Sequence, residues 1–342
     1  MKLYTLKIES IKEETSNCIT LCFKQPGLRK IKYLAGQYLT LSLRINGRKY
    51  QRPYSLSSSP SIDSLLEVTI KRMQKGLVSN YIHDDLKVGN LIEVMEPLGN
   101  FCYTHNINDD TIYFWGAGSG ITPLISIIKE VLATFPKIKI HLIYINKNAE
   151  SIIFSETLNQ LLVLYPSVFS ITHFFTQLNV GTKLPNVIHA KINKQFIVEL
   201  LKNITVNNKH YICGPIELKN VIKETLSELG ILSSNIFSED FNLAINPKDF
   251  DNIKTQKIIL NFNNTNIEFE VTKGKSVLEG ALDSGIELPY SCQTGNCSTC
   301  KGTLKSGELK MLGLSKERND IKIGEYLLCC SYPLTDNVYI EI

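Results

Sequence analysis

The chain has 342 residues, enough for two or three domains of ordinary size. Hydrophobic residues make up 43% and charged residues 20%, which is typical of a globular protein and not of a disordered or fibrous one. The net charge of +4 is too small to indicate nucleic acid as the main partner. No signal-peptide pattern begins the chain, and its longest uncharged run, 111–128, is too short and too interrupted to span a membrane. We therefore expect a cytoplasmic protein without a membrane span.

Residues 1–104 are expected to form an antiparallel β-barrel. Short apolar stretches alternate with turn signals, which is the spacing of a small all-β domain. Asn46-Gly47 is a strong hairpin signal, because both central positions of such a turn need positive φ. The apolar stretches are residues 19–23, 38–43, 65–70 and 91–94.

Residues 105–240 change to an alternation of strands and helices, which predicts a parallel α/β sheet. Gly230 closes the last expected helix. The expected strands are 111–115, 139–145, 171–176 and 210–213, and the expected helices are 121–135, 155–165 and 216–229.

The next stretch, 241–255, is rich in Asn, Asp and Lys and is expected to be a linker. Residues 256–342 then form a separate domain in this interpretation. It begins with a hairpin whose turn is 263–266 and continues with a helix over 276–284. Ser276 and Glu279 have the spacing of a capping box at the start of that helix.

The strongest chemical signal is the spacing Cys292-x4-Cys297-x2-Cys300, followed at a distance by Cys329. Four thiolates at this spacing are typical of a [2Fe–2S] cluster. Gly295 allows the backbone to wrap closely, so that amide groups face the sulfur atoms. The alternatives are a structural zinc site, which usually has two short paired spacings, and unrelated free thiols.

This C-terminal segment resembles the plant-type ferredoxins, from Pro289 through Pro333. The resemblance implies an α+β domain of the β-grasp fold. In that family the fourth ligand lies four residues before a proline, which selects Cys329 over Cys330. The chain departs from the family at Gln293, where an arginine or lysine usually follows the first ligand.

A candidate flavin site begins with Arg52-Pro53-Tyr54-Ser55. On an extended chain Arg52 and Tyr54 lie on one side, where a guanidinium can bind a phosphate and a phenol ring can pack on a flat heterocycle. Gly76 and Ser79 stand at the start of an expected helix, whose backbone N–H groups can bind an anion. The alternative is an ordinary edge-strand arginine and core tyrosine.

Two glycine-containing loops form the candidate nucleotide site. Gly116-Ala117-Gly118-Ser119-Gly120 lies between a strand and a helix, with Pro123 expected at the first helical position. The segment 213–215, Cys-Gly-Pro, follows another strand of the same sheet. For Cys213 the alternative is a buried core cysteine.

The residues after the second strand of this sheet bear on nucleotide choice. An acidic residue there would favour NAD through the ribose hydroxyls, whereas Lys147 and Ser151 are suited to the 2′-phosphate of NADPH. A solvated loop is the alternative for Lys147, and Glu150 leaves NADH open. Glu239, at the end of the α/β segment, is either a carboxylate near the flavin ring or part of a plain acidic turn.

The first two segments together resemble the ferredoxin–NADP reductase family, through R-x-Y-S, the downstream G-x-x-S and the two loops above. By this resemblance Arg52 contacts the flavin phosphate, Tyr54 lies against the isoalloxazine, Ser55 lies near its N5 atom and Cys213 lies beside the nicotinamide. The implied flavin-binding residues are Arg52, Tyr54, Ser55, Ile70, Lys71, Gly76, Val78, Ser79, Thr122 and Glu239. The implied nucleotide-binding residues are Gly116, Gly118, Gly120, Thr122, Pro123, Lys147, Ser151, Cys213, Gly214 and Pro215.

The order of the three segments resembles the fused reductases of multicomponent oxygenases such as phenylacetyl-CoA epoxidase. The resemblance implies electron transfer from NADPH or NADH through FAD to a [2Fe–2S] cluster, and on to a protein acceptor that is an oxygenase component. Because flavin converts a two-electron hydride into single electrons, no catalytic side-chain acid or base is expected. Phthalate-type reductases share the domain order and use FMN. The alternatives are a reductase of a hybrid-cluster protein or small electron carrier, and a redox-sensing module.

Overall fold

The computed structural model describes residues 2–27, 30–106, 110–177, 185–202, 204–314 and 317–342. The chain divides into two compact units. The first contains residues up to Ser42 together with Tyr54–Glu239, and the second contains Leu43–Pro53 together with Asp240–Ile342. No helix in the described ranges is both long enough and apolar enough to cross a membrane.

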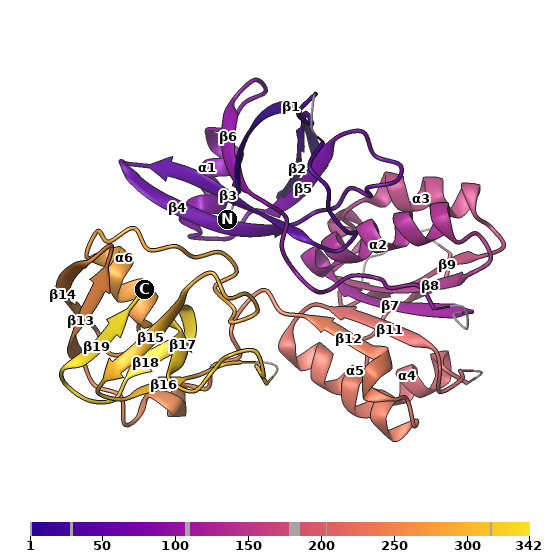
Figure 1. The fold of residues 1–342 in the computed structure, drawn as a ribbon. Helices are drawn as coiled ribbons and strands as arrows, with labels where there is room; N and C mark the ends of the chain where they lie inside the picture. The colour runs from indigo at the N-terminus through magenta and orange to yellow at the C-terminus, as the bar shows by residue number, and fades with distance from the viewer. Residues whose placement is uncertain (1, 28–29, 107–109, 178–184, 203, 315–316) are drawn as a thin grey trace. The chain divides into compact units, whose positions relative to one another are not determined.

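The N-terminal part is a six-stranded antiparallel sheet that curves into the expected barrel (Figure 1). Along the sheet the order is β4-β3-β6-β1-β2-β5. The elements are β1 (Leu3–Thr15), β2 (Cys18–Phe23), β3 (Tyr38–Ile45), β4 (Arg48–Ser55), β5 (Leu66–Lys71), α1 (Leu77–Asp84) and β6 (Leu91–Met95). The turn between β3 and β4 has φ of 50° at Asn46 and 80° at Gly47, as the sequence predicts.

Strand β1 is not among the strands expected from the sequence. This strand has only two buried side chains, Leu6 and Ile8, among lysines and glutamates. Its pairing with β2 is shifted between Ile8 and Ser10 and again between Glu13 and Thr15. These irregularities break the period-two pattern by which a strand is recognised in sequence.

The middle part is a six-stranded parallel sheet with the order β10-β9-β8-β7-β11-β12. Helices α2 and α3 cover one face and helices α4 and α5 cover the other (Figure 1). The elements are β7 (Thr111–Ala117), η1 (Gly118–Gly120), α2 (Ile121–Thr134), β8 (Lys139–Asn146), η2 (Ala149–Ser151), α3 (Ser155–Leu164), β9 (Phe169–Phe175), β10 (Val187–Ile188), α4 (Lys194–Leu200), β11 (Lys209–Cys213), α5 (Ile216–Glu228), η3 (Ser233–Asn235) and β12 (Ile236–Glu239).

Two details differ from the expectation. Helix α2 begins at Ile121, so Pro123 is its third residue and not its first. Proline is tolerated there because the first-turn N–H groups have no partner within the helix. The short elements β10, α4 and β12 were missed, since a few residues of mixed polarity leave no recognisable period.

The protein has a single tryptophan, and it lies inside this sheet. Trp115 on β7 is fully buried, and its Nε1–H group donates a hydrogen bond to Nδ1 of His210 over 3.2 Å. The His210 ring stacks on Tyr113 with the ring centres 5.1 Å apart. Burial lowers the pKa of His210 to about 3, so this imidazole stays neutral at physiological pH.

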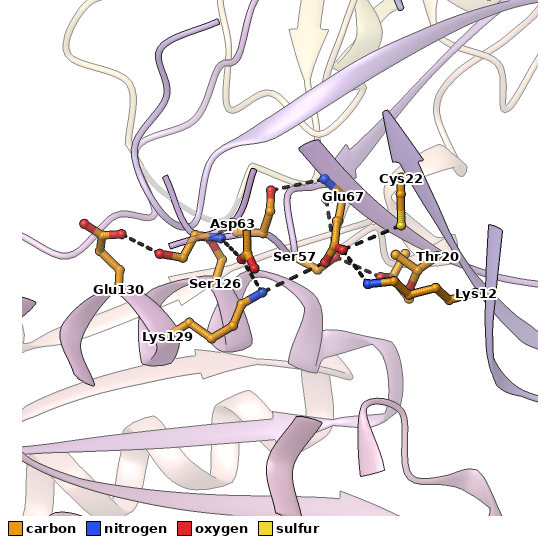
Figure 2. A network of polar contacts seen from close by, with 12 residues as sticks. Lys12, Thr20, Cys22, Ser57, Asp63, Glu67, Ser126, Lys129 and Glu130 are labelled. Carbon is orange, nitrogen blue, oxygen red and sulfur yellow. Dashed lines mark hydrogen bonds and ion pairs between the residues drawn. The ribbon is translucent and has the colours of Figure 1, made fainter. Parts of the chain in front are cut away.

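A network of polar contacts fastens α2 to the barrel within the first unit (Figure 2). The Lys129 ammonium is 2.6 Å from the Asp63 carboxylate and 4.0 Å from that of Glu67. Ser126 Oγ donates to the backbone oxygen of Ser58. Next to it, the Glu130 carboxylate accepts hydrogen bonds from the hydroxyls of Ser59 and Ser61, each over 2.6 Å. The contacts therefore join a helix of the parallel sheet to loop and strand residues of the barrel.

The second unit contains a five-stranded sheet of order β14-β13-β19-β15-β17 and a two-stranded sheet of β16 and β18. Helix α6 packs on this fold with the expected capping box, in which Ser276 and Glu279 each bond the other's backbone N–H. The turn of the first hairpin is shorter than expected, because only Asn263 and Asn264 connect the strands, both with positive φ. The elements are η4 (Pro247–Phe250), β13 (Gln256–Phe262), β14 (Thr265–Val271), α6 (Val277–Asp283), β15 (Lys301–Ser306), β16 (Leu309–Met311), β17 (Glu325–Leu327), η5 (Leu328–Cys330), β18 (Ser331–Pro333) and β19 (Val338–Glu341).

Candidate functional site

The four cysteines selected from the sequence lie together in the second unit. Cys292, Cys300 and Cys329 are buried, while Cys297 is partly exposed. The loop that holds the first three turns through Gly295, whose φ is +71°. A β-carbon at this position would come within 2.2 Å of the end of the Leu314 side chain, so the backbone conformation favours glycine and any other residue would displace Leu314.

Their sulfur atoms lie against one another. The thiols of Cys297 and Cys329 both contact the Cys292 sulfur, and the Cys329 thiol also contacts that of Cys300; these contacts lower the pKa of Cys292 and Cys300 and raise the pKa of Cys297 and Cys329. The backbone N–H groups of Thr294 and Cys297 donate to the Cys292 sulfur, over 3.5 and 3.3 Å. A site that gathers four thiols and directs backbone amides at a sulfur fits the chemistry of an iron–sulfur cluster.

Four cysteines are the number that a [2Fe–2S] cluster takes, because each of its two irons is held by two protein thiolates.

Cys330 has different surroundings from Cys329. It is fully buried, and its thiol donates to the backbone oxygen of Leu327 at 3.4 Å. Its own carbonyl accepts a hydrogen bond from the Leu312 N–H. These contacts are consistent with a structural role for Cys330 and leave Cys329 as the predicted fourth ligand.

The residue after the first cysteine contacts the Leu43–Pro53 segment of the same unit. Gln293 has φ of +56° and donates from Nε2 to the Gln51 carbonyl over 3.2 Å. The Gln51 N–H donates to the Tyr290 hydroxyl over 2.9 Å. Gln293, which stands where the ferredoxin family usually has a cation, is therefore a neutral hydrogen-bonding residue.

In the first unit, three predicted residues from distant segments meet at one end of the parallel sheet. Glu239 is the last residue of β12 and is paired in register with Cys213, the last residue of β11. The Ser55 hydroxyl donates to the Glu239 carboxylate over 3.4 Å. Burial raises the pKa of Cys213 well above its ordinary value, so Cys213 remains a neutral thiol.

The two predicted nucleotide loops touch each other. A β-carbon on Gly120 would lie 2.1 Å from the Cys213 carbonyl oxygen, and one on Gly214 would lie 3.0 Å from the Ala117 β-carbon. A β-carbon on Gly118 would lie 3.6 Å from the Lys71 ammonium. The loop after β7 therefore lies between the Cys213 loop and a predicted flavin-binding lysine.

Helix α1 begins at the predicted G-x-x-S segment. Gly76 precedes its first residue, and no side chain caps the helix. The Ser79 hydroxyl accepts from the Met73 N–H and donates to the Gly76 carbonyl, over 3.1 and 3.3 Å. A β-carbon on Gly76 would lie only 2.6 Å from the Ser79 Oγ, so this turn depends on glycine.

The other predicted flavin residues divide by exposure. Ile70, Val78 and Thr122 are buried, and Thr122 Oγ1 donates to the Ser119 carbonyl over 3.0 Å. Arg52 and Tyr54 are partly exposed on β4, and Arg52 Nη1 donates to the Gln51 carbonyl over 2.8 Å. Both arginine and tyrosine thus keep part of their surface available for a ligand.

The predicted 2′-phosphate residues differ from each other. Lys147 is exposed after β8. The Ser151 hydroxyl donates to the Asn148 carbonyl over 2.8 Å and accepts from the Asn148 N–H over 3.1 Å, as part of a capping box. Because Ser151 is already engaged locally, Lys147 is the better candidate of the two for an anionic group.

Two residues near these sites are not predicted from the sequence. Lys219 on α5 is almost completely buried, and its ammonium donates to the Glu239 carbonyl over 3.4 Å, next to Cys213. Arg318 reaches back to the cysteine loop. A lysine in a helix and an arginine in a charged loop both resemble solvated residues, so no sequence signal distinguishes them.

Comparison with known proteins now defines the class. Three protein-family models match the chain: an oxidoreductase FAD-binding domain over residues 5–103, an oxidoreductase NAD-binding domain over 114–224 and a 2Fe-2S iron-sulfur cluster binding domain over 260–334. The protein is an oxidoreductase dependent on a nicotinamide nucleotide, FAD and an iron–sulfur cluster. The chain belongs to the family of oxygenase reductases that join these three domains in one polypeptide.

The similarity extends over the whole length. The chain is 29% identical to a component of the 1,2-phenylacetyl-CoA epoxidase of Escherichia coli (strain K12), with 99% of this chain and 97% of that protein covered. It is 30% identical to the ferredoxin reductase component of 3-ketosteroid-9-alpha-monooxygenase from Rhodococcus rhodochrous, with coverage of 98% and 96%. Its fold matches that of phthalate dioxygenase reductase with a TM-score of 0.70, 22% identity and coverage of 99% and 98%.

Proposed function

We propose that this protein takes electrons from NADPH or NADH and delivers them, through FAD and a [2Fe–2S] cluster on Cys292, Cys297, Cys300 and Cys329, to the oxygenase component of a multicomponent system. The observation on which the proposal chiefly depends is the cysteine loop, in which four thiols interact in pairs and backbone amides donate to sulfur. FAD supplies the conversion between a two-electron hydride and single electrons.

The proposed roles in the first unit follow from the contacts at the end of the sheet. Ser55 and Glu239, held 3.4 Å apart, would position the reactive edge of the flavin. The contact between Gly120 and Cys213 would hold the two nucleotide loops at a fixed spacing, with Cys213 beside the nicotinamide. Since Cys213 stays neutral, it contributes packing and not charge.

The proposed binding of phosphates uses three features. Arg52 and the start of α1 at Gly76 would bind the flavin phosphates, because a guanidinium and free backbone N–H groups both bind anions. Gly116, Gly118 and Gly120 would bind the pyrophosphate of the nucleotide. Lys147 would contact a 2′-phosphate, which favours NADPH.

The acceptor is proposed from the names of the full-length relatives, which are components of an epoxidase and of a monooxygenase. An oxygenase such as phenylacetyl-CoA epoxidase is therefore the proposed partner.

Cofactor analysis of the purified protein tests the proposal. We expect one FAD and two irons per chain, released by acid and measured by chromatography and metal analysis. Ferricyanide accepts electrons from flavin directly, whereas cytochrome c reports the cluster, so both activities are expected with NADPH. Zinc in place of iron would contradict the cluster site, and FMN in place of FAD would contradict the flavin assignment. Reduction of candidate oxygenase components, each purified and mixed with the reductase, would then identify the acceptor.

A further inference from the structure

Arg318 lies between β16 and β17 and extends over the cysteine loop. Its side chain is only 13% exposed, while that of its partner Asp320 is 59% exposed. The arginine is thus the inner member of the ion pair and the aspartate is the outer one.

All five N–H donors of the Arg318 guanidinium have partners. Nε and Nη2 each donate over 2.7 Å to one oxygen of the Asp320 carboxylate, which fixes the plane of the group. Nη2 also donates to the Ser298 hydroxyl over 2.8 Å. Nη1 donates to the carbonyl of Cys297 over 3.3 Å and to that of Gly295. The guanidinium therefore binds Gly295, Cys297 and Ser298 of the loop, around the most exposed of the four cysteines.

The loop itself provides no cation. No charged residue occurs between Ser291 and Cys300, and the following Lys301 forms an ion pair with Glu325 over 2.8 Å. Gln293 occupies the position after the first cysteine and donates its amide to Gln51. Within the described residues, the Arg318 guanidinium is consequently the positive charge that hydrogen-bonds the loop around Cys297, whereas Arg52 shares the Gln51 carbonyl with Gln293 at the other end of the loop.

We propose that Arg318 is the positioning residue of the cluster-binding loop and that its charge makes the cluster easier to reduce. This inference rests on the proposed cluster site. Reduction adds one negative charge to the cluster, so a nearby, partly buried cation stabilises the reduced state more than the oxidised state. Asp320 orients the guanidinium and, from its exposed position, opposes part of its effect.

The test measures the midpoint reduction potential of the cluster in the purified holoprotein, by a redox titration monitored with absorption and EPR spectroscopy. We expect Arg318→Gln to shift the one-electron equilibrium about tenfold against reduction, equivalent to about 59 mV. Asp320→Asn should shift it in the opposite direction, by a smaller factor because Asp320 is exposed. The conservative variant Arg318→Lys should stay within about threefold of wild type. The matched control is Lys322→Gln, which removes an exposed charge from the same segment and should have almost no effect.

A second measurement separates the role of Arg318 in holding the loop from the effect of its charge on the reduction potential. Hydrogen exchange of the amides from Gln293 to Ser298 should be faster in both Arg318 variants, since lysine cannot reproduce the planar fork. An intact cluster spectrum with an unchanged potential in Arg318→Gln, or equal shifts of the same sign in Arg318→Gln and Asp320→Asn, would overturn the inference. If Arg318→Gln does not retain the cluster, the direction of the shift in Asp320→Asn relative to wild type still decides the charge effect. A wild-type protein without iron would overturn the cluster site as well.

Discussion

Two adjacent cysteines close the iron–sulfur loop, and their environments differ at the level of single hydrogen bonds. The Cys329 thiol contacts Cys292, Cys300 and Cys330, and the Cys330 thiol also donates to the Leu327 carbonyl. The resemblance to ferredoxins selects Cys329 as the fourth ligand. Its contacts with two other predicted ligands support that prediction.

We expect Cys329→Ser to lose the visible absorption of the cluster and the reduction of cytochrome c. NAD(P)H-to-ferricyanide activity should largely remain, because the flavin can still deliver electrons. Cys330→Ser is the matched variant and should keep both the absorption and the cytochrome c activity. The reverse pattern would show that the fourth ligand has been misassigned.

Nucleotide choice also depends on a single residue. Lys147→Ala should raise KM for NADPH and leave NADH nearly unchanged, because only NADPH has a 2′-phosphate. A lysine–phosphate contact contributes about 1–3 kcal/mol, which corresponds to about 5- to 150-fold in kcat/KM. Steady-state kinetics with both nucleotides measure the effect, and Ser151→Ala should be weaker because that hydroxyl is engaged with Asn148. Equal losses for the two nucleotides would contradict the role of Lys147.

At the level of elements, the contact between η1 and the end of β11 requires a residue without a side chain at Gly120. Gly120 has φ of −62°, which any residue can adopt, so its requirement for glycine is purely one of space. A β-carbon would overlap the Cys213 carbonyl. The sequence predicts a glycine loop here but does not show which glycine meets the neighbouring loop.

Gly120→Ala is expected to separate these loops and lower the free energy of unfolding by about 1–3 kcal/mol. Nucleotide affinity should fall with it. Gly27→Ala, which would meet no atom within 4 Å, is the control and should change stability by less than about 0.5 kcal/mol. Denaturant unfolding and nucleotide titration test both statements, and an unaffected Gly120→Ala would show that the loops can move apart without cost.

A buried histidine on strand β9 makes the stability of the parallel sheet depend on pH. His173 is buried, its Nδ1 has no hydrogen-bond partner among the residues that the structure describes, and burial lowers its pKa to about 4. Between about pH 6.5 and 4 the unfolded chain binds a proton that the folded chain excludes, so stability falls as pH falls through this window.

The loss should amount to at most about 3 kcal/mol and should be complete below the folded-state pKa. His173→Leu removes one of the buried histidines and should make the dependence of unfolding free energy on pH less steep between 7 and 4, while His210, whose pKa is lowered to about 3, keeps its own contribution. Circular dichroism in denaturant, compared between wild type and variant at each pH, isolates this contribution from other acid effects. Parallel curves for the two proteins would rule out His173 as the cause.

Much of the element pattern was predictable from sequence. The central strands of the parallel sheet are continuous apolar runs, and the capping box at Ser276 and the turn at Asn46 have local chemical causes. The capping box and the turn need no tertiary information. By contrast, β1, β12 and the contacts of Lys219 and Arg318 depend on partners far away in the chain, which one sequence does not reveal.

At the level of the whole molecule, most of the barrel and the whole parallel sheet belong to one compact unit, while Leu43–Pro53 of the barrel belongs to the other. The polar network around Lys129 joins them, and its acidic partners come from the barrel (Figure 2). Charged residues scattered over a sequence usually predict solvated surfaces, so this junction had no signal in the sequence.

Lys129→Met should destabilise the first unit by about 1–3 kcal/mol, because it leaves the partly buried Asp63 carboxylate without its ammonium partner, while Glu67 keeps the Lys12 ammonium over 2.6 Å. Lys194→Met breaks an exposed ion pair with Glu228 and should cost less than about 1 kcal/mol. Thermal unfolding compares the two, and similar small effects would mean that the network is solvated in solution. Lys129→Met combined with Asp63→Asn should recover part of the loss, since it removes one unpaired charge.

The buried tryptophan also makes the protein convenient for spectroscopy. Trp115 is the only indole in the chain, and it lies inside the parallel sheet one residue before Gly116. Its fluorescence therefore reports on a single environment, and the emission of the folded protein should be blue-shifted relative to that of the unfolded chain. Emission from this one fluorophore can follow the unfolding of the first unit without interference from the second, which contains no tryptophan.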